Sequence, residues 1–237
     1  MKEKVIVSGQ IIEVIGYSRL NTGSQDMEKV RAGTGIKRQE NYANRQQTRR
    51  NMIRRLVTSN FNMKYAKFQT LTFAENLQDL KEANARYKAY IRKLRKKYGQ
   101  FKYVTVIEFQ KRGAIHYHML SDLPYIPIEE LQEMWIYGFV KVNAVDHVDN
   151  LGAYLVKYMT KDNADERLQG EKGYLISQGL IRPQEYKSWV DGNQSIEEII
   201  ARYKLDKKKP TYDATYESEH NGTTRYLQFN LSRRVKK

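Results

Sequence analysis

Residues 65–146 constrain the fold of this chain more than any other stretch, because strand-like and helix-like patterns alternate there in a definite order. Segments rich in β-branched and aromatic residues predict strands, and segments with apolar residues at helical spacing predict helices. The predicted strands are 65–73, 101–109, 114–123 and 138–146, and the predicted helices are 76–99 and 128–135. The order strand, helix, strand, strand, helix, strand is typical of a split βαβ fold, as in ferredoxin-like and RRM-like domains. We therefore predict the α+β class, with one antiparallel sheet and helices on one of its faces.

The ends of the predicted helices are marked by residues that favour helix boundaries. Asn76 suits the N-cap of the first helix, and Gly99 suits its C-terminal end. Pro127 precedes the second helix. A further helix is expected after the last strand, over 148–162.

The flanks of this core carry weaker signals, and they divide the chain into three predicted segments. These are an N-terminal basic segment, 1–60, the core, 61–165, and a C-terminal extension, 166–237. The extension ends in a predicted β-hairpin around the turn-forming pair Asn221–Gly222, for which a type I′ turn is expected.

The N-terminal segment is densely basic between Arg31 and Arg55, where Glu40 is the single acidic residue. Apolar residues at helical spacing follow in its second half, at Met52, Ile53, Leu56 and Val57. Two interpretations are open: a basic helix that docks at its C-terminal end, or a mobile basic arm.

The charge of the chain restricts its partners. There are 42 Lys and Arg residues against 27 Asp and Glu, a formal net charge of +15. Such an excess favours binding to a polyanion, either nucleic acid or an anionic membrane. No apolar run is long enough to cross a membrane, and the N-terminus lacks the apolar region of a secretory signal, so neither membrane insertion nor export is expected. The absence of cysteine excludes disulfides, cysteine-ligated zinc and a cysteine nucleophile, and it suits a reducing cytoplasm.

The predicted hairpin formed by 101–109 and 114–123 brings two histidines and a glutamate together. If Gly113 closes a three-residue loop in the left-handed conformation, Glu108 pairs with His116. Alternate residues of a strand share a face, so Glu108, His116 and His118 converge on one side of the sheet. The opposite, core side then receives Phe109, Ile115, Tyr117 and Met119.

Two imidazoles and one carboxylate leave coordination positions open for water and a phosphate oxygen. This ligand set suits a divalent cation, Mn²⁺ or Mg²⁺, better than a closed structural zinc site. The alternative is a Glu–His pair on a solvated sheet face, which contributes under about 1 kcal/mol.

The helix expected over 148–162 places Tyr154, Tyr158 and Lys161 on one face, and Lys157 and Lys161 each follow a tyrosine by three residues. A tyrosine, a divalent cation and a nearby ammonium group together suit phosphodiester transesterification. The cation polarises the phosphate, and the ammonium favours ionisation of a phenol whose ordinary pKa is about 10. In a tyrosine-rich chain the same spacing also fits a core or stacking face.

Three ordered motifs resemble those of HUH-endonuclease rolling-circle replication initiators of Gram-positive plasmids and phages. They are FQTLTF (68–73), AIHYHML (114–120) and YLVKYMTK (154–161), and the resemblance extends over about residues 45–182. It implies site-specific nicking of single-stranded DNA at a replication origin, with a 5′-phosphotyrosine and a free 3′-OH as products, and strand joining at termination.

Residue by residue, the resemblance implies that His116 and His118 are metal ligands and that Glu108 is the third. It implies Tyr158 as first nucleophile and Tyr154 as second, assisted by Lys157 and Lys161, with Thr70 and Thr72 as support beside the metal. The basic residues expected to contact DNA are Arg49, Arg50, Arg54, Arg55, Lys111 and Arg112. No phosphate-loop motif occurs in the chain, so a host helicase is the expected partner for unwinding.

Two alternatives remain at this stage. The first is a relaxase or transposase of the same superfamily, although relaxases usually carry a third histidine where this chain has Tyr117 and Met119 around the pair. The second is a non-catalytic RRM-like module that binds single-stranded nucleic acid through stacking tyrosines. That module would leave Glu108, His116 and His118 without a role.

Overall fold

The chain divides into two compact units, each with its own antiparallel sheet. The computed structural model describes residues 2–19, 35–159, 172–218 and 222–233. The first unit combines residues 1–47 with 182–237, and the second comprises 48–181. Among the described residues, none of the helices has the length and apolar character needed to cross a membrane.

The sheet of the second unit has the strand order β6-β3-β5-β4-β7, and all neighbouring strands are antiparallel. Strands β3 and β4 are joined through helix α2 and run parallel to each other with β5 between them. This is the predicted split βαβ arrangement, and the α+β class is confirmed. The elements are β3 (Lys67–Thr72), α2 (Leu80–Tyr98), β4 (Tyr103–Phe109), β5 (Ile115–Ser121), α3 (Ile128–Met134), β6 (Val140–Asn143) and β7 (Tyr174–Ile176).

Helix α2 begins later than the sequence pattern predicted. The N-cap is Asp79, whose carboxylate accepts a hydrogen bond from the backbone N–H of Glu82 at 2.9 Å, so the prediction of Asn76 was wrong. The side chain of Asn76 instead donates to the carbonyl of Arg112 at 3.1 Å. An aspartate at the N-cap satisfies the same free N–H groups as an asparagine, so residue type alone does not distinguish the two positions. Gly99 ends the helix as predicted, with a φ of 78°.

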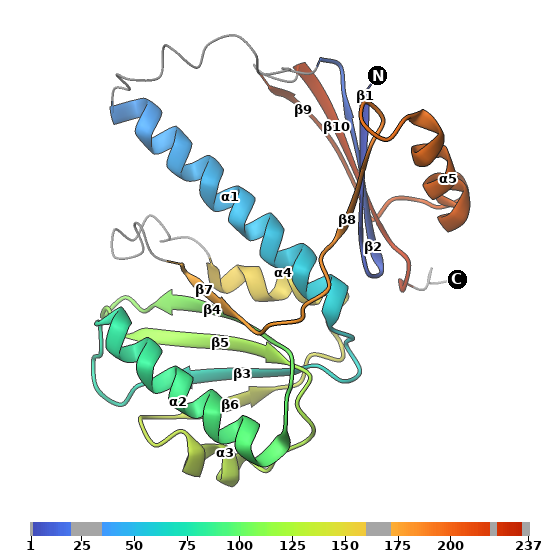
Figure 1. Cartoon of the computed structure of the whole chain (residues 1–237). Coiled ribbons are helices and arrows are strands. Elements are labelled where there is room, and N and C mark those ends of the chain that lie inside the picture. The colour runs from blue at the N-terminus through green and yellow to red at the C-terminus, as the bar shows by residue number, and fades with distance from the viewer. Residues whose placement is uncertain (1, 20–34, 160–171, 219–221, 234–237) are drawn as a thin grey trace. The chain divides into compact units, whose positions relative to one another are not determined.

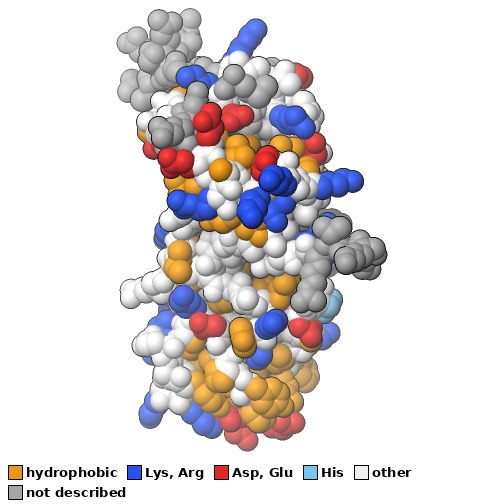
Figure 2. Space-filling model, turned by 90° about the vertical axis from the view of Figure 1, so that its right-hand side faces the viewer, with side chains coloured by type: hydrophobic (Ala, Val, Ile, Leu, Met, Phe, Trp, Pro, Cys, Tyr) orange, Lys and Arg blue, Asp and Glu red, His pale blue; other side chains and the backbone are white. Residues whose placement is uncertain are grey.

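The surface around α3 keeps several hydrophobic side chains exposed. Tyr125, Ile128 and Ile136 are 82%, 40% and 66% exposed, and the neighbouring Glu129 and Glu133 are exposed or nearly so. Figure 2 shows hydrophobic side chains gathered beside acidic ones at the lower end of that view. The surface near α3 is thus apolar and acidic, although the chain as a whole is basic.

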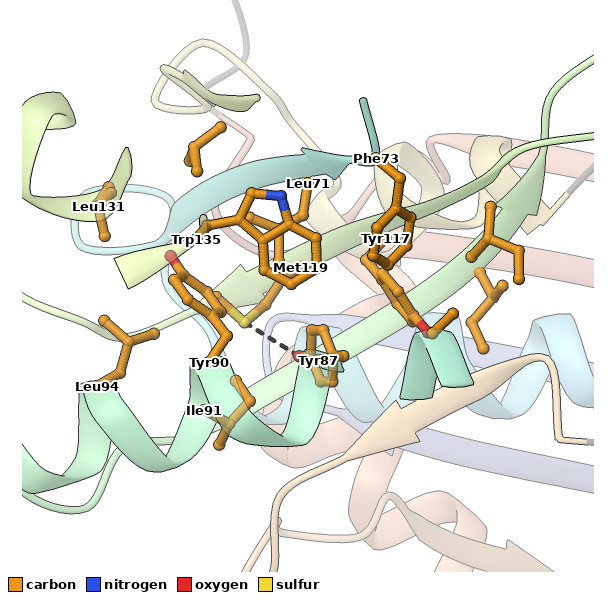
Figure 3. Close-up of a cluster of buried hydrophobic side chains, with 14 of the residues drawn as sticks. Leu71, Phe73, Tyr87, Tyr90, Ile91, Leu94, Tyr117, Met119, Leu131 and Trp135 are labelled. Carbon is orange, nitrogen blue, oxygen red and sulfur yellow. Dashed lines mark hydrogen bonds between the residues drawn. The ribbon is translucent and has the colours of Figure 1, made fainter. Parts of the chain in front are cut away.

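One face of this sheet packs against α2 and α3 (Figure 1). Its core is unusually rich in aromatic rings, and their polar atoms are satisfied. The Tyr87 hydroxyl lies 2.6 Å from Thr105 Oγ1 and donates to Met119 Sδ at 3.2 Å (Figure 3), and the Tyr90 hydroxyl donates to Gln69 at 3.0 Å. Paired in this way, the phenols are buried without unsatisfied polar groups.

The opposite face of the same sheet is also covered by helices. Helix α4 (Leu151–Val156) and the C-terminal half of α1 (Gly35–Asn60) pack against it, so the prediction of helices on one face describes α2 and α3 only. Ile53, Leu56 and Val57 of α1 are at most 1% exposed. The basic helix therefore docks at its C-terminal end as predicted, and this part of the chain is not a mobile arm.

The sheet of the first unit joins the two ends of the chain. Its order is β8-β1-β2-β10-β9, with β2 paired to β10, and α5 packs on one face. The elements are β1 (Lys2–Ser8), β2 (Ile11–Tyr17), β8 (Gln184–Lys187), α5 (Asn193–Tyr203), the 3₁₀ helix η3 (Leu205–Lys207), β9 (Tyr212–Ser218) and β10 (Gly222–Asn230).

The hairpin predicted for the C-terminal extension is confirmed by the pairing of β9 with β10, whereas its turn lies outside the described residues. The two units differ from the three segments expected from the sequence. The reason is that β1 and β2 pair with β8 and β10, which are distant in sequence, and such pairing leaves no local signature.

Gly152 of α4 is the point of closest approach between α4 and α1. A Cβ atom at this position would lie 2.3 Å from the backbone oxygen of Arg54. Helix propensity alone would make Gly152→Ala stabilising, whereas the clash with backbone makes it destabilising, by about 1–3 kcal/mol. The midpoint of urea unfolding should therefore fall, while Lys88→Ala on the exposed side of α2 should leave it nearly unchanged. A rise in the midpoint for Gly152→Ala would contradict this packing.

Candidate metal and tyrosine site

The hairpin of β4 and β5 has the predicted register. The backbone N–H of Gln110 donates to the carbonyl of Ala114 at 2.9 Å, and the N–H of Gly113 donates to that of Gln110 at 2.7 Å. Gly113 has a φ of 93°, which an L-residue with a side chain rarely adopts. Glu108 consequently lies opposite His116, as predicted.

Glu108, His116 and His118 form a group that could hold a metal ion, here called the triad. One ligand atom from each residue lies within 4.8 Å of the other two. Both histidines are buried, whereas the Glu108 side chain is 39% exposed. Two nitrogen donors backed by the core and one carboxylate open to solvent fit a divalent cation that keeps further positions for water or substrate.

His118 is held from both sides of its ring. Its Nε2 lies 2.6 Å from Glu108 Oε2, and its Nδ1 lies 3.1 Å from Thr70 Oγ1. Since a carboxylate only accepts, the neutral ring carries its hydrogen on Nε2, and Nδ1 accepts from the Thr70 hydroxyl. Binding of a cation through Nε2 would require the opposite tautomer, in which Nδ1–H donates to Thr70. A hydroxyl can serve in both states because it donates and accepts.

The charge states of the triad favour ligation at neutral pH. Burial, together with the nearby His118, lowers the pKa of His116 to about 4, so its imidazole is neutral with a free lone pair. The hydrogen bond from His118 lowers the pKa of the Glu108 carboxyl, which is therefore ionised.

Helix α4 delivers two tyrosines to the triad. Asn150 caps its first turn by accepting from the N–H of Ala153 at 2.9 Å, and the helix tightens into the 3₁₀ helix η1 (Lys157–Met159). The ring of Tyr158 stacks on His118, with ring centroids 3.9 Å apart and planes inclined by 22°. The Tyr158 hydroxyl donates to that of Tyr154 at 3.5 Å.

Phe68 links the three sequence motifs. Its buried ring contacts Tyr154 and Tyr158, with centroids 5.1 and 5.3 Å apart, and lies 6.0 Å from the ring of His118. The sequence analysis did not identify this residue as part of the site. The available signal was its position two residues before Thr70, which places both on the same face of β3.

The environment of Tyr158 keeps its hydroxyl protonated. Burial raises the pKa of this phenol, and the hydrogen bond to Tyr154 and the charge of Glu108 act in the same direction. Lys157 places its Nζ 4.8 Å from the centroid of the Tyr154 ring. Lys161 lies outside the described residues.

The basic residues predicted to bind DNA lie in two places. Lys111 and Arg112 line a hollow at the β4–β5 turn together with Glu108, Phe109 and Gln110. That hollow is adjacent to the triad because Glu108 belongs to both. The remaining four, Arg49, Arg50, Arg54 and Arg55, lie on α1 and are partly exposed.

Protonation of His116 should make the metal-free protein sensitive to mild acid. In the unfolded chain its pKa is about 6.5, so between pH 6.5 and 4 the unfolded state binds more protons and the free energy of unfolding falls as the pH decreases. With EDTA present, the urea midpoint should drop from pH 7 to pH 5, and His116→Gln should reduce that drop. His147→Gln, which alters a 73% exposed side chain, should not. An equal drop in all three proteins would contradict the pKa of His116.

The comparisons with known proteins agree with this geometry. Residues 66–163, which contain β3 to β6, the triad and both tyrosines, match a family model described as replication-associated protein, the ORF2 family. Comparisons with curated proteins and with solved structures yield no match. Over the matched residues the chain is therefore similar to this family of replication-associated proteins, in keeping with a replication initiator of the Rep type.

Proposed function

We propose that the protein is a metal-dependent DNA nickase and strand transferase that initiates rolling-circle replication, of the HUH-endonuclease type. The observation that carries this proposal is the stacking of Tyr158 on His118, at 3.9 Å, within a group of three potential metal ligands. It places a nucleophile of the correct type beside the ligands that would bind the scissile phosphate.

In the proposed reaction, Tyr158 Oη attacks the phosphorus and the bond from phosphorus to the 3′-oxygen breaks. The phenol loses one proton and the leaving 3′-oxygen gains one, so the products are a 5′-phosphotyrosine and a free 3′-OH. A Mn²⁺ or Mg²⁺ held by Glu108, His116 and His118 would supply polarisation of the phosphate and stabilisation of the charge on the leaving oxygen. One ester replaces another, so the reverse reaction joins strands.

The chain provides a route for the proton and a second nucleophile. Tyr158 donates its hydrogen bond to Tyr154, and Lys157 lies over the ring of Tyr154. We assign Lys157 to assist ionisation of Tyr154, and Tyr154 to act as proton acceptor in the first transfer and as nucleophile in the second. Because burial raises the pKa of Tyr158, ionisation is coupled to arrival of substrate and the phenol is protected until then. Lys161 keeps its proposed assisting role.

The proposal includes DNA as substrate and a separate helicase for unwinding. Lys111 and Arg112 border the triad and are assigned to the strand near the scissile phosphate. Arg49, Arg50, Arg54 and Arg55 of α1 are assigned to phosphate contacts further along the DNA.

Formation of a covalent adduct tests the assignment of the nucleophile. A pool of random single-stranded oligonucleotides labelled at the 3′ end should become attached to the protein in the presence of Mn²⁺, because the 5′-phosphate side of the cut stays on the tyrosine. Tyr158→Phe should remove the adduct, whereas Tyr154→Phe should retain it. Mass spectrometry of the labelled peptide identifies the residue. Full adduct from Tyr158→Phe would transfer the role to Tyr154, and tight binding without adduct, insensitive to EDTA, would favour a non-catalytic RRM-like module.

Calorimetric titration with Mn²⁺ tests the triad independently of DNA. The metal-stripped protein should bind the ion, and Glu108→Gln or His116→Ala should weaken binding by at least about tenfold. His147→Ala serves as the matched histidine control and should bind as the unaltered protein does. Unchanged affinity in both triad variants would show that the ion binds elsewhere.

A further inference from the structure

The row of side chains that contains the triad continues across the sheet to its edge. Glu108 of β4 lies opposite His116 of β5, which lies opposite Thr72 of β3. The N–H of Thr72 then donates to the carbonyl of Phe139 at 3.0 Å, and the N–H of Phe139 donates to Thr72 Oγ1 at 3.1 Å. Phe139 therefore ends the row at the β6 edge.

Phe139 and Lys141 lie on the same face of the sheet as the triad. Val140, between them, is buried in the core on the α2 side, and alternate residues of a strand point to opposite faces. Lys141 pairs with Thr70, the residue that contacts His118. Two strand spacings separate Phe139 from His116, a distance of about 10 Å.

These two side chains have no structural role that accounts for them. The Phe139 ring is 74% exposed, and within the described part of the chain it stacks on no other ring. Lys141 is exposed and forms no ion pair with any described residue. An exposed aromatic ring beside an unpaired cation, on the face of the triad, is suited to a base and its phosphate.

Charge distinguishes this place from the other exposed apolar surface of the unit. Around α3, exposed Tyr125 and Ile136 lie among acidic side chains, which would repel a nucleic acid (Figure 2). The triad row has cations at both ends instead, Lys141 at the β6 edge and Arg112 beside Glu108 in the hollow at the β4–β5 turn.

We propose that Phe139 and Lys141 form a binding subsite for one nucleotide of the single strand, with the base stacked on Phe139 and its phosphate bound by Lys141. The strand then crosses the sheet along the row, from the hollow near Arg112, over the triad, to the β6 edge. This inference rests on the proposed function, because it assigns the path of the substrate through that site.

Binding of a fluorescein-labelled oligothymidylate, followed by fluorescence anisotropy in EDTA, tests the subsite without chemistry. Phe139→Ala should weaken binding about 5- to 100-fold, the range for loss of one base-stacking contact. Phe139→Tyr should restore it and Phe139→Leu should not, since a ring and not apolar bulk is required. Lys141→Gln should reduce the slope of log Kd against log salt concentration by about 1.

Two controls separate this subsite from general surface effects. Val142→Ala removes a 39% exposed side chain of the same strand that points to the opposite face, and Tyr125→Ala removes an exposed aromatic ring elsewhere. Both should bind as the unaltered protein does. Equal binding by Phe139→Ala, or equal weakening in the controls, would overturn the subsite.

The adduct assay keeps the two proposals distinguishable. If Phe139→Ala binds normally while the unaltered protein forms the adduct, the subsite is wrong and the nickase stands. If Phe139→Ala weakens binding while no adduct forms in the unaltered protein, the binding subsite stands and strand cleavage is wrong.

Discussion

The hydrogen-bonded register between β4 and β5 is the constraint on which the candidate site depends. It places Glu108 opposite His116 and puts His118 on the same face, while Tyr117 and Met119 enter the aromatic core on the other face. A shift by one residue would exchange the two sets and bury the polar triad against α2. The apolar residues therefore hold the register, since the free energy of burying them opposes the shift.

The tyrosines reach the triad through packing between elements that are distant in sequence. Phe68 of β3 contacts both rings of α4 and η1, and Gly152 allows the α4 backbone to approach Arg54 of α1. Aromatic contacts of this kind contribute about 0.5–1.5 kcal/mol each beyond their burial. The same burial that orders Tyr158 also raises its pKa, so the arrangement favours position and protection over a resting phenolate.

Much of the second unit follows from local patterns in the sequence. Periodicity predicted the strands and both helices between them, and the loop glycine predicted the hairpin register down to the pairing of Glu108 with His116. The N-cap of α2 was misplaced because Asn76 and Asp79 have equal capping chemistry. The first unit was not predicted, since its sheet pairs β2 with β10 across most of the chain.

By itself, the sequence determined which residues share a face and which chemistry they could perform. Alternation along a strand and the spacing along a helix depend only on backbone geometry, so the triad and the pair of tyrosines are readable from the letters. Only the tertiary structure decided that Tyr158 lies against His118, that Phe68 joins the motifs, and that Phe139 extends the row to the β6 edge. Those contacts arise between separate elements, and the free energy that selects them comes from burial of side chains that no single segment contains.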